Sequence, residues 1–500
     1  MDTEKEMKSM MLIGTVVDSC PLPYLFQRAM VEASSGRPVL FYVDQGSIYY
    51  RVNRRMEGRW SRPVRVAEGS RDFSVCIDDK DNIYLCYVRG NGLYFRKLSP
   101  WQRRWRPGKE TEVTLGQSGC SYASLALHEG MLWAAACEWK ENPSEVIDGA
   151  YMMQDVPETY EYAVTIKRSN DGGLTWHESH SMSGESCSVP VLVSFGGKLA
   201  CIYSHGLALK WLLRKDDDPI DQWEDQGEIV NNMIAIDLFN CCAANDKLHL
   251  MYKKSGIRHI LFDGEGWKND PVQLSEEPMD NDATMSSSGS GLWSFWSKSY
   301  GARRSAVVGR RWKEGRWGEE VNLSPPFDVC LAFDGSAYRD ITDAMMSEAS
   351  PPVTFGGKVD SALYFGSSLQ FTGLNMSLSE GEGGSYSFEF WNGEEWEEVI
   401  GLEDGTGGLT ASGVVGFSAL MNLEKNEVSG FERFWLRIRR TSPAERNPVI
   451  HRALPLGHFV SLATAAAVHS FVPVAWVDAT SLFSRNLLYS GIAADKETID

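Results

Sequence analysis

The feature of this sequence that most limits its fold is a repeated unit of three short apolar strands that ends on a tryptophan. Successive closing tryptophans are 45, 71, 47, 44 and 50 residues apart. A period of about 40–50 residues with roughly four short strands per unit is typical of the blades of a β-propeller. The longest interval is one period plus an insertion near residues 140–162. The closing residues are Trp60, Trp105, Trp176, Trp223, Trp267 and Trp317.

The repeat stops near residue 324 and resumes close to the end of the chain. Segments 461–470, 472–479 and 485–492 supply three strands of a further unit, and the N-terminal run 10–18 can supply the fourth. Pairing the two chain ends in one sheet would close the ring and remove open sheet edges. The sequence therefore predicts an all-β fold, a seven-bladed β-propeller closed by N- and C-terminal strands, with an inserted β-sandwich domain.

The predicted sandwich lies between two plausible linkers. Alternating apolar and polar strands, separated by Gly, Asp and Asn turns at about ten-residue spacing, favour a sandwich there. Three segments follow from this division. They are residues 1–326 with blades one to six and the closing N-terminal strand, 327–448 as the inserted sandwich, and 449–500 as the last blade and a C-terminal tail.

Composition narrows the function classes. A net charge of −18 disfavours nucleic-acid binding, because neutralising phosphates needs a basic surface. The longest early apolar run, residues 10–17, is too short to span a membrane, and without a small-residue cleavage site it is not expected to be a signal peptide. The ten cysteines form no CxxC pair, and no histidine lies at zinc-finger spacing. We therefore expect no metal, no cofactor, and buried free thiols in a reducing compartment.

The sharpest local motif covers residues 169–176, which read Ser-Asn-Asp-Gly-Gly-Leu-Thr-Trp. The serine and aspartate are expected to bond local backbone groups in a tight hairpin, glycine permits positive φ, and the tryptophan packs beneath. The segment matches every defined position of S-x-D-x-G-x-T-W and resembles the Asp-box of sialidase-like propellers. In that family the box is a fold element on the outer rim, away from the catalytic centre. The structural positions are Ser169, Asp171, Gly173, Thr175 and Trp176.

We find no match in this sequence for the catalytic residues of that family. Its members use three arginines on the substrate carboxylate, a Tyr–Glu nucleophile pair, an Asp acid/base and an early F/Y-R-I-P motif. The nearest sequence here is YYRVN, in which Arg51 lies on a third strand rather than facing the axis. Residues 107–167, 169–213 and 259–302 contain no arginine, and lysine is a poor substitute for the guanidinium fork. We therefore assign no catalytic residue and favour a protein without enzymatic activity.

Four motifs in the predicted sandwich give a second resemblance. The segment is similar to a β-sandwich module common in tail and baseplate proteins of phages and phage-like particles. That resemblance implies a structural or docking component, present in multiple copies beside other particle proteins and assembled in the cytoplasm. Asn392-Gly393 is also a signal for a type I′ hairpin. The motifs are Ala-Leu-Tyr-Phe-Gly (362–366), Phe-Trp-Asn-Gly-Glu-Glu-Trp (390–396), Asp-Gly-Thr-Gly-Gly-Leu-Thr (404–410) and Trp-Leu-Arg-Ile-Arg (435–439).

Two further segments allow a functional interpretation beside a plain one. The acidic, aromatic insertion 141–162 is either a surface loop or a contact loop for a partner or a cell-surface glycan, through Tyr151, Met152, Asp155 and Tyr160. The basic cluster within 303–316 either meets an acidic partner surface, such as another subunit's sandwich, or occupies exposed edge positions. The first hypothesis is thus a non-enzymatic structural or glycan-contacting component of a phage or phage-like particle. The alternative is a sialidase-like glycoside hydrolase or a carbohydrate-binding protein with an accessory sandwich.

Overall fold

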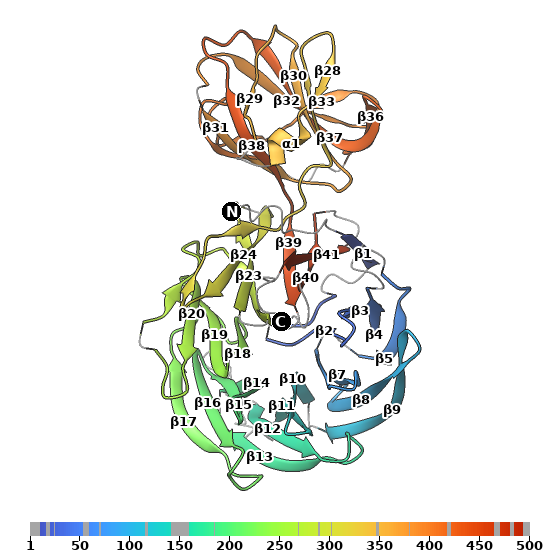
Figure 1. Ribbon diagram of the computed structural model, residues 1–500, viewed down its shortest axis with the longest axis vertical. Coiled ribbons are helices and arrows are strands. Elements are labelled where there is room, and N and C mark those ends of the chain that lie inside the picture. The colour runs from blue at the N-terminus through green and yellow to red at the C-terminus, as the bar shows by residue number, and fades with distance from the viewer. Residues whose placement is uncertain are drawn as a thin grey trace, which may run out of the picture.

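The described part of the chain is almost entirely β-structure. Small antiparallel sheets are arranged around a common axis, and two larger sheets form a separate lobe beside them (Figure 1). The one helix in the described residues is the short α1 (Thr342–Met346). This all-β arrangement is consistent with a propeller. The computed structural model describes residues 11–16, 21–24, 26–53, 60–69, 72–115, 119–141, 160–184, 186–268, 270–288, 291–301, 303–346, 350–379, 381–417, 422–464, 471–480 and 485–493.

Six of the small sheets are antiparallel meanders whose strands follow one another in the chain. The first contains β2 (Met30–Glu32), β3 (Pro38–Asp44), β4 (Ser47–Val52) and β5 (Val64–Glu68), and the second β6 (Phe73–Ile77), β7 (Ile83–Arg89), β8 (Gly92–Trp101) and β9 (Arg104–Leu115). The third contains β10 (Gly119–His128), β11 (Met131–Glu141), β12 (Tyr160–Ser169) and β13 (His177–Ser183), and the fourth β14 (Cys187–Phe195), β15 (Lys198–His205), β16 (Ala208–Lys215) and β17 (Glu224–Val230). The fifth contains β18 (Phe239–Ala244), β19 (Lys247–Lys254), β20 (Gly256–Phe262) and β21 (Val272–Gln273), and the sixth β22 (Asn281–Ser288), β23 (Gly291–Ser299), β24 (Ser305–Lys313), β25 (Arg316–Trp317) and β26 (Val321–Asn322).

The seventh small sheet joins both ends of the chain. Its order is β1-β41-β40-β39, and β1 pairs antiparallel with β41 from Met11↔Tyr489 to Val16↔Arg485. On one side it shares a buried cluster with the sixth sheet, through Trp476 and Trp293. On the other side it shares a cluster with the first sheet, so the small sheets pack in a closed succession. The strands are β1 (Met11–Val16), β39 (Phe459–Thr464), β40 (Phe471–Asp478) and β41 (Arg485–Ala493).

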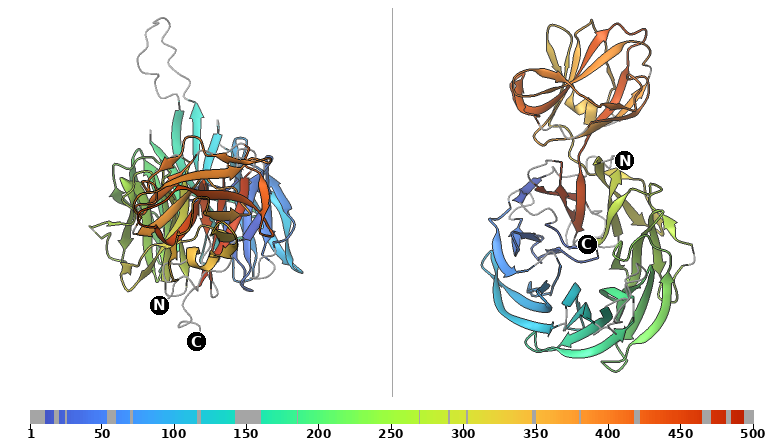
Figure 2. Two further views of the ribbon diagram at one scale, coloured as in Figure 1. Left: turned by 90° about the horizontal axis from the view of Figure 1, so that it is seen from above. Right: turned by 180° about the vertical axis from the view of Figure 1, so that it is seen from behind.

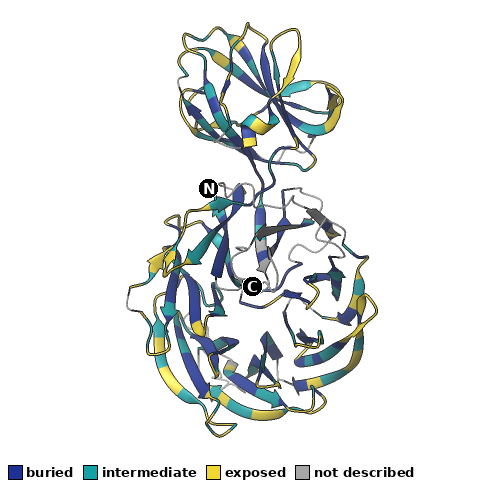
Figure 3. Ribbon diagram, viewed as in Figure 1, coloured by how far each residue is buried: buried dark blue, intermediate teal, exposed yellow. Residues whose placement is uncertain are grey.

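The closing tryptophans join neighbouring sheets. Five of the six, all but Trp60, lie at the turn before, or within, the outermost strand of their sheet and pack against an aromatic side chain of the preceding sheet. Packing of such large rings at these junctions explains why the tryptophan recurs at a fixed place in the unit. Figure 3 shows the buried residues on the inner strands and the exposed ones on the outer strands. The ring-centroid distances are 6.4 Å for Tyr50–Trp105, 5.2 Å for Phe95–Trp176, 5.7 Å for Trp133–Trp223, 5.4 Å for Trp211–Trp267 and 5.1 Å for His259–Trp317.

The lobe consists of two sheets that enclose one hydrophobic core, and Figure 2 shows it outside the ring of small sheets. β38 belongs to the lobe, because it pairs with β31 and buries Ile450 and Ala453 in the core, although the predicted boundary at residue 448 precedes it. The larger sheet holds β27 (Val329–Phe333), β28 (Tyr338–Asp340), β30 (Ala362–Ser367), β32 (Ser385–Trp391), β33 (Trp396–Glu398), β36 (Lys425–Val428) and β37 (Phe431–Ser442). The smaller holds β29 (Val353–Thr354), β31 (Gly373–Ser379), β34 (Glu403–Asp404), β35 (Gly413–Gly416) and β38 (Val449–Leu456).

Among the described residues, the junction between the ring and the lobe is held by backbone bonds, by side-chain hydrogen bonds such as that from Asn375 Nδ2 to Tyr300 OH at 3.3 Å, and by an ion pair. Ser305 N donates to Gly457 O at 2.6 Å, and Gly457 N donates back to Ser305 O at 3.2 Å. The Arg304 side chain is buried and its guanidinium contacts the Glu403 carboxylate. The interpretation of this basic cluster as wholly exposed edge positions is therefore wrong for Arg304, which binds an acidic group of its own chain.

The hairpin at Asn392-Gly393 differs from its prediction. β32 ends at Trp391 and β33 begins at Trp396, so the loop has four residues rather than two. Gly393 has φ 101°, whereas Asn392 is not among the residues with positive φ, as type I′ would require. The Asn392 side chain instead accepts bonds from the backbone N–H groups of Glu394 and Glu395, at 2.9 and 2.8 Å. This local cap explains the four-residue loop.

Candidate functional site

The Asp-box closes the turn between β12 and β13. Ser169 Oγ donates to Asp171 Oδ1 at 2.7 Å, and Gly173 N donates to Ser169 Oγ at 2.9 Å. Thr175 donates to Asp171 from its hydroxyl at 2.6 Å and from its backbone at 3.0 Å. These bonds, with that from Leu174 N, hold the pKa of Asp171 well below its usual range. The carboxylate therefore serves the turn and is not available for chemistry on a ligand.

The same turn packs closely against the second sheet. Gly173 has φ 92°, and a Cβ placed there would lie 2.0 Å from Cε1 of Phe95. Thr111 Oγ1 donates to Gly173 O at 2.7 Å, and the half-buried Trp176 packs on Phe95. Glycine is required by both the conformation and the space. The Asp-box therefore connects the third sheet to the second.

The structure describes little of the predicted contact loop. Tyr151, Met152 and Asp155 lie outside the described residues, and Tyr160 is described only as the first residue of β12, paired with Glu141 of β11. Their role in binding stays a prediction.

A cavity of about 340 Å³ lies on the axis of the ring, between the first strands of the six meander sheets. Its lining includes the polar residues Ser74, Ser124, Thr284, Ser286 and Asn240. Ser124 Oγ also accepts a bond from Leu192 N at 2.9 Å, and Asn240 Oδ1 accepts one from Met285 N at 3.2 Å. Hydroxyls and amides that converge on a cavity can bond the hydroxyls of a polar ligand. The cavity is the first candidate site.

Arg28 supplies the single guanidinium among the described residues that line this cavity. Burial raises the pKa of Cys76 to about 12, and the charge of Arg28 opposes that shift. Arg28 acts in the same way on the Cys241 thiol, which belongs to the fifth sheet whereas Cys76 belongs to the second. The charge of Arg28 thus acts on thiols of two different sheets that line the cavity. No described carboxylate forms an ion pair with it.

The segment before β2 covers one end of the cavity. The Phe26 ring lies 5.6 Å from Tyr24, 5.8 Å from Tyr122 and 6.0 Å from Phe239 of the fifth sheet. Gln27 Nε2 donates to Ala123 O at 2.9 Å, in the third sheet. This segment is therefore bonded across the axis, and Arg28, an exposed residue of the same segment, lines the cavity.

Asp72 fixes the segment from the side of the second sheet. Its buried carboxylate accepts bonds from Gln27 Nε2 at 2.5 Å, from Tyr122 N at 2.6 Å and from Ala123 N at 2.7 Å. A buried carboxylate needs such donors, because an unpaired charge away from water is costly. Three sheets are thereby linked at the closed end of the cavity.

No sequence motif marks Arg28. The arginine nearest to the F/Y-R-I-P pattern is Arg51, whose side chain donates to Tyr42 OH at 3.2 Å and contacts the carbonyl of Ile13 in the seventh sheet. Arg51 thus connects the first sheet to the seventh, in agreement with its assignment away from the axis. The one sequence feature that could have indicated Arg28 is its position just before the first inner strand, where the chain reaches the axis of the ring.

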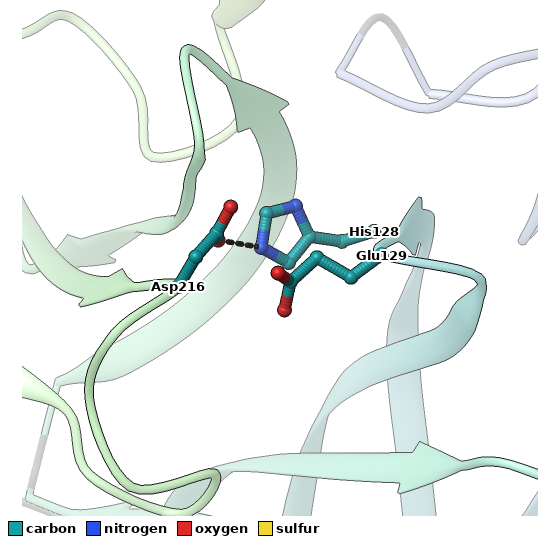
Figure 4. A group of neighbouring side chains, drawn as sticks. All are labelled: His128, Glu129 and Asp216. Atoms are coloured by element: carbon teal, nitrogen blue, oxygen red, sulfur yellow. Dashed lines mark hydrogen bonds and ion pairs between the residues drawn. The ribbon is translucent and has the colours of Figure 1, made fainter.

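A second group of titratable side chains lies at the turns of the third and fourth sheets (Figure 4). Both ring nitrogens of His128 are occupied, by Ser194 Oγ at 2.8 Å and by Asp216 Oδ1 at 2.7 Å. Arg214 lies 3.7 Å from Glu129 and 3.9 Å from Asp216. The guanidinium already supplies the positive charge that these carboxylates require. The group therefore holds the third and fourth sheets together.

Comparisons with known proteins do not assign a family. No protein-family model and no curated protein matches the chain. Among solved structures, a polysaccharide lyase of family PL25, an ulvan lyase bound to a sugar fragment, is 9% identical over 72% of this chain and 93% of its own, with a TM-score of 0.43. AofleA from Arthrobotrys oligospora is 12% identical over 63% and 90%, with a TM-score of 0.41. Trypanosoma rangeli sialidase is 11% identical over 90% and 94%, with a TM-score of 0.39. None of these three is a particle protein, and that role stays a prediction.

Proposed function

We propose that the protein is a carbohydrate-binding protein and that its axial cavity takes an acidic sugar without cleaving it. The observation that carries this proposal is Arg28, an exposed arginine that lines a cavity with serine, threonine and asparagine residues and pairs with no described carboxylate. A guanidinium fork matches a carboxylate in two parallel bonds. The surrounding serine, threonine and asparagine side chains suit the hydroxyls of a sugar ring.

Binding is favoured over hydrolysis by what surrounds Arg28. Glycoside cleavage commonly needs two carboxyl groups that flank the scissile bond, and sialidases use a tyrosine nucleophile. The described lining holds one carboxylate, Glu32, and no tyrosine, histidine or aspartate. The lining thiols of Cys76 and Cys241 are buried with raised pKa values, so they are neutral and poor nucleophiles.

The same proposal includes the architecture. The seven small sheets are seven propeller blades, the last composed of both chain ends, and the lobe is a sandwich inserted between the sixth and seventh. The clusters that join the seventh sheet to the sixth and to the first support this. The predicted division at residues 1–326, 327–448 and 449–500 then changes at one boundary, because β38 (Val449–Leu456) belongs to the sandwich, which extends to residue 456.

Calorimetric titration of the full chain with glucuronic acid and with glucose tests the proposed activity. Glucuronic acid should bind and glucose should bind at least tenfold more weakly, because the carboxylate pairs with Arg28. Arg28→Gln should weaken glucuronic acid binding by roughly 10–100-fold, as expected for a lost charged hydrogen bond. The matched control is Arg103→Gln, at an exposed position. Equal affinity of wild type and Arg28→Gln, or release of sugar from a sialoside, would contradict the proposal.

A second candidate function rests on the four sandwich motifs. In this hypothesis the sandwich anchors the chain to other proteins of a phage-like particle assembled in the cytoplasm, and many copies turn weak glycan contacts into avidity. Mass spectrometry of particles purified from the source organism tests it. A fixed copy number per particle is expected, and absence from particles would end the hypothesis.

A further inference from the structure

A second cavity, of about 510 Å³, lies at the rim between the third and fourth sheets, which are neighbours in Figure 1. We call it the rim cleft. Half-buried rings of Trp139, Tyr162 and Tyr122 form part of its wall. The hydroxyls of Ser186 and Ser188, together with that of Ser121, form another part. Rings beside hydroxyls offer both an apolar face and hydrogen bonds to one ligand.

The indole of Trp139 is held in place by its neighbours. Trp139 of β11 is paired with Tyr162 of β12 on one side and with Gly119 of β10 on the other. A Cβ at Gly119 would lie 2.0 Å from Cζ2 of the indole. The absence of that atom lets the ring lie across the strand of its neighbour. A ring fixed in this way loses little conformational freedom when it stacks on a ligand.

Two bulges direct other side chains to the cleft. The register of β10 shifts between Ser121 and Ser124, and Tyr122 has φ 61°. The register of β14 shifts after Ser188, and Val189 has φ 50°. Positive φ at a β-branched residue is unfavourable, and bulges beside sites commonly re-aim side chains. The sixth sheet has the same shift between Asn281 and Thr284, with φ 55° at Asp282, so the bulge is a repeated feature of the fold. At the third and fourth sheets it brings Ser121, Tyr122 and Ser188 to the wall of one cavity.

The chemistry of the wall restricts the ligand. The lining residues Ser121, Tyr122, Trp139, Tyr162, Ser186 and Ser188 are joined by Cys137, Cys187, Gly206 and Ile236, and none of these side chains is charged at neutral pH. Burial raises the pKa of Cys137 to about 12, so this thiol stays protonated. A charged ligand would lose its hydration without gaining a partner. The ligand is therefore neutral.

We propose that the rim cleft binds a neutral pyranose ring, stacked on Trp139 and bonded through Ser121, Ser186 and Ser188. The apolar C–H face of such a ring matches the indole, and its hydroxyls match the serines. This site is separate from the axial cavity and does not depend on Arg28. The protein would then bind a neutral sugar in the rim cleft and the acidic sugar in the axial cavity.

Saturation-transfer NMR on the full chain tests the site, with the methyl pyranosides of glucose, galactose and mannose as probes. At least one should receive saturation, and titration should show at least tenfold weaker binding to Trp139→Ala. The matched control is Trp101→Ala, which removes an indole that is 56% exposed on β8. Trp101→Ala should bind within twofold of wild type. If Arg28→Gln alone lost binding, the sugar would be bound in the axial cavity and not in the rim cleft, and the proposal would be overturned.

Three other outcomes would also overturn it. They are the absence of saturation transfer to every glycoside, equal binding by Trp139→Ala, and displacement of the glycoside by N-acetyl-leucinamide at lower concentration, which would make the cleft a peptide site. If Trp139→Ala fails to fold, as shown by its thermal transition, Ser188→Ala replaces it. That variant should weaken binding about threefold to tenfold, and an unchanged affinity would count against the site.

Discussion

Acidification from pH 7.5 to 5 should destabilise the contact between the fifth and sixth sheets, where two histidines are buried as a neutral pair. His249 and His259 are 3% and 1% exposed, with 3.0 Å between Nδ1 of the first and Nε2 of the second. Trp317 Nε1 donates to Nδ1 of His259 at 3.2 Å. His259 must therefore carry its proton on Nε2 and donate it to His249. An added proton on either bonded nitrogen would break one of these bonds.

The size of the effect follows from the two pKa values. Burial lowers the pKa of His249 from 6.5 to about 4 and that of His259 from 6.5 to about 3, the latter aided by its neighbour. Below pH 6.5 the unfolded chain binds these protons and the folded chain does not, so stability is present above 6.5 and is lost as the pH falls toward 4. At pH 5 each histidine costs about 2 kcal/mol, and the pair about 4 kcal/mol. That is a large part of the roughly 5–15 kcal/mol that stabilises a typical domain.

Urea unfolding at pH 7.5, 6.5, 5.5 and 5, followed by tryptophan fluorescence, measures this loss. The double variant His249→Gln/His259→Gln should lose about 4 kcal/mol less than wild type over that range. His177→Gln is the matched control, because His177 is exposed, and it should follow wild type. If the double variant and wild type lose the same free energy, the pair is not the source of the pH dependence and the argument fails.

Three further predictions concern stability. Gly173→Ala should lower the free energy of unfolding by about 1–3 kcal/mol through its clash with Phe95, whereas Gly172→Ala, with open space around it, should cost about 1 kcal/mol or less, both from urea midpoints. Glu389→Gln removes the charge that pairs with Arg437 and Arg439, and only Arg439 keeps a second carboxylate, that of Asp360; the lobe should lose about 3 kcal/mol, seen as faster proteolysis there than in the ring. Asp72→Asn removes the charge from three hydrogen bonds and should lower the thermal midpoint, while an unchanged midpoint would rule out its linking role.

Sequence patterns were informative wherever one large side chain marks one place in a unit. Trp105 and Trp176 recur at a fixed turn because each fills a gap between adjacent sheets, so spacing alone located the units. The motif at 169–176 was equally local, since its bonds join residues within four positions.

The candidate sites could not be found in this way. Phe26 meets Phe239 across 213 positions of sequence, and Arg28, two positions further along, lines the axial cavity. The rim cleft depends on bulges near Tyr122 and Val189, and a bulge without glycine has no sequence signature. The order of strands in the ring determines both sites, whereas local patterns report only on single units.

The most direct test of the central claim is a crystal structure of the protein grown with glucuronic acid. The account predicts the sugar in the axial cavity, with its carboxylate on the Arg28 guanidinium and its hydroxyls on the serine and asparagine side chains of the inner strands. A sugar bound elsewhere while the axial cavity holds only water would contradict it.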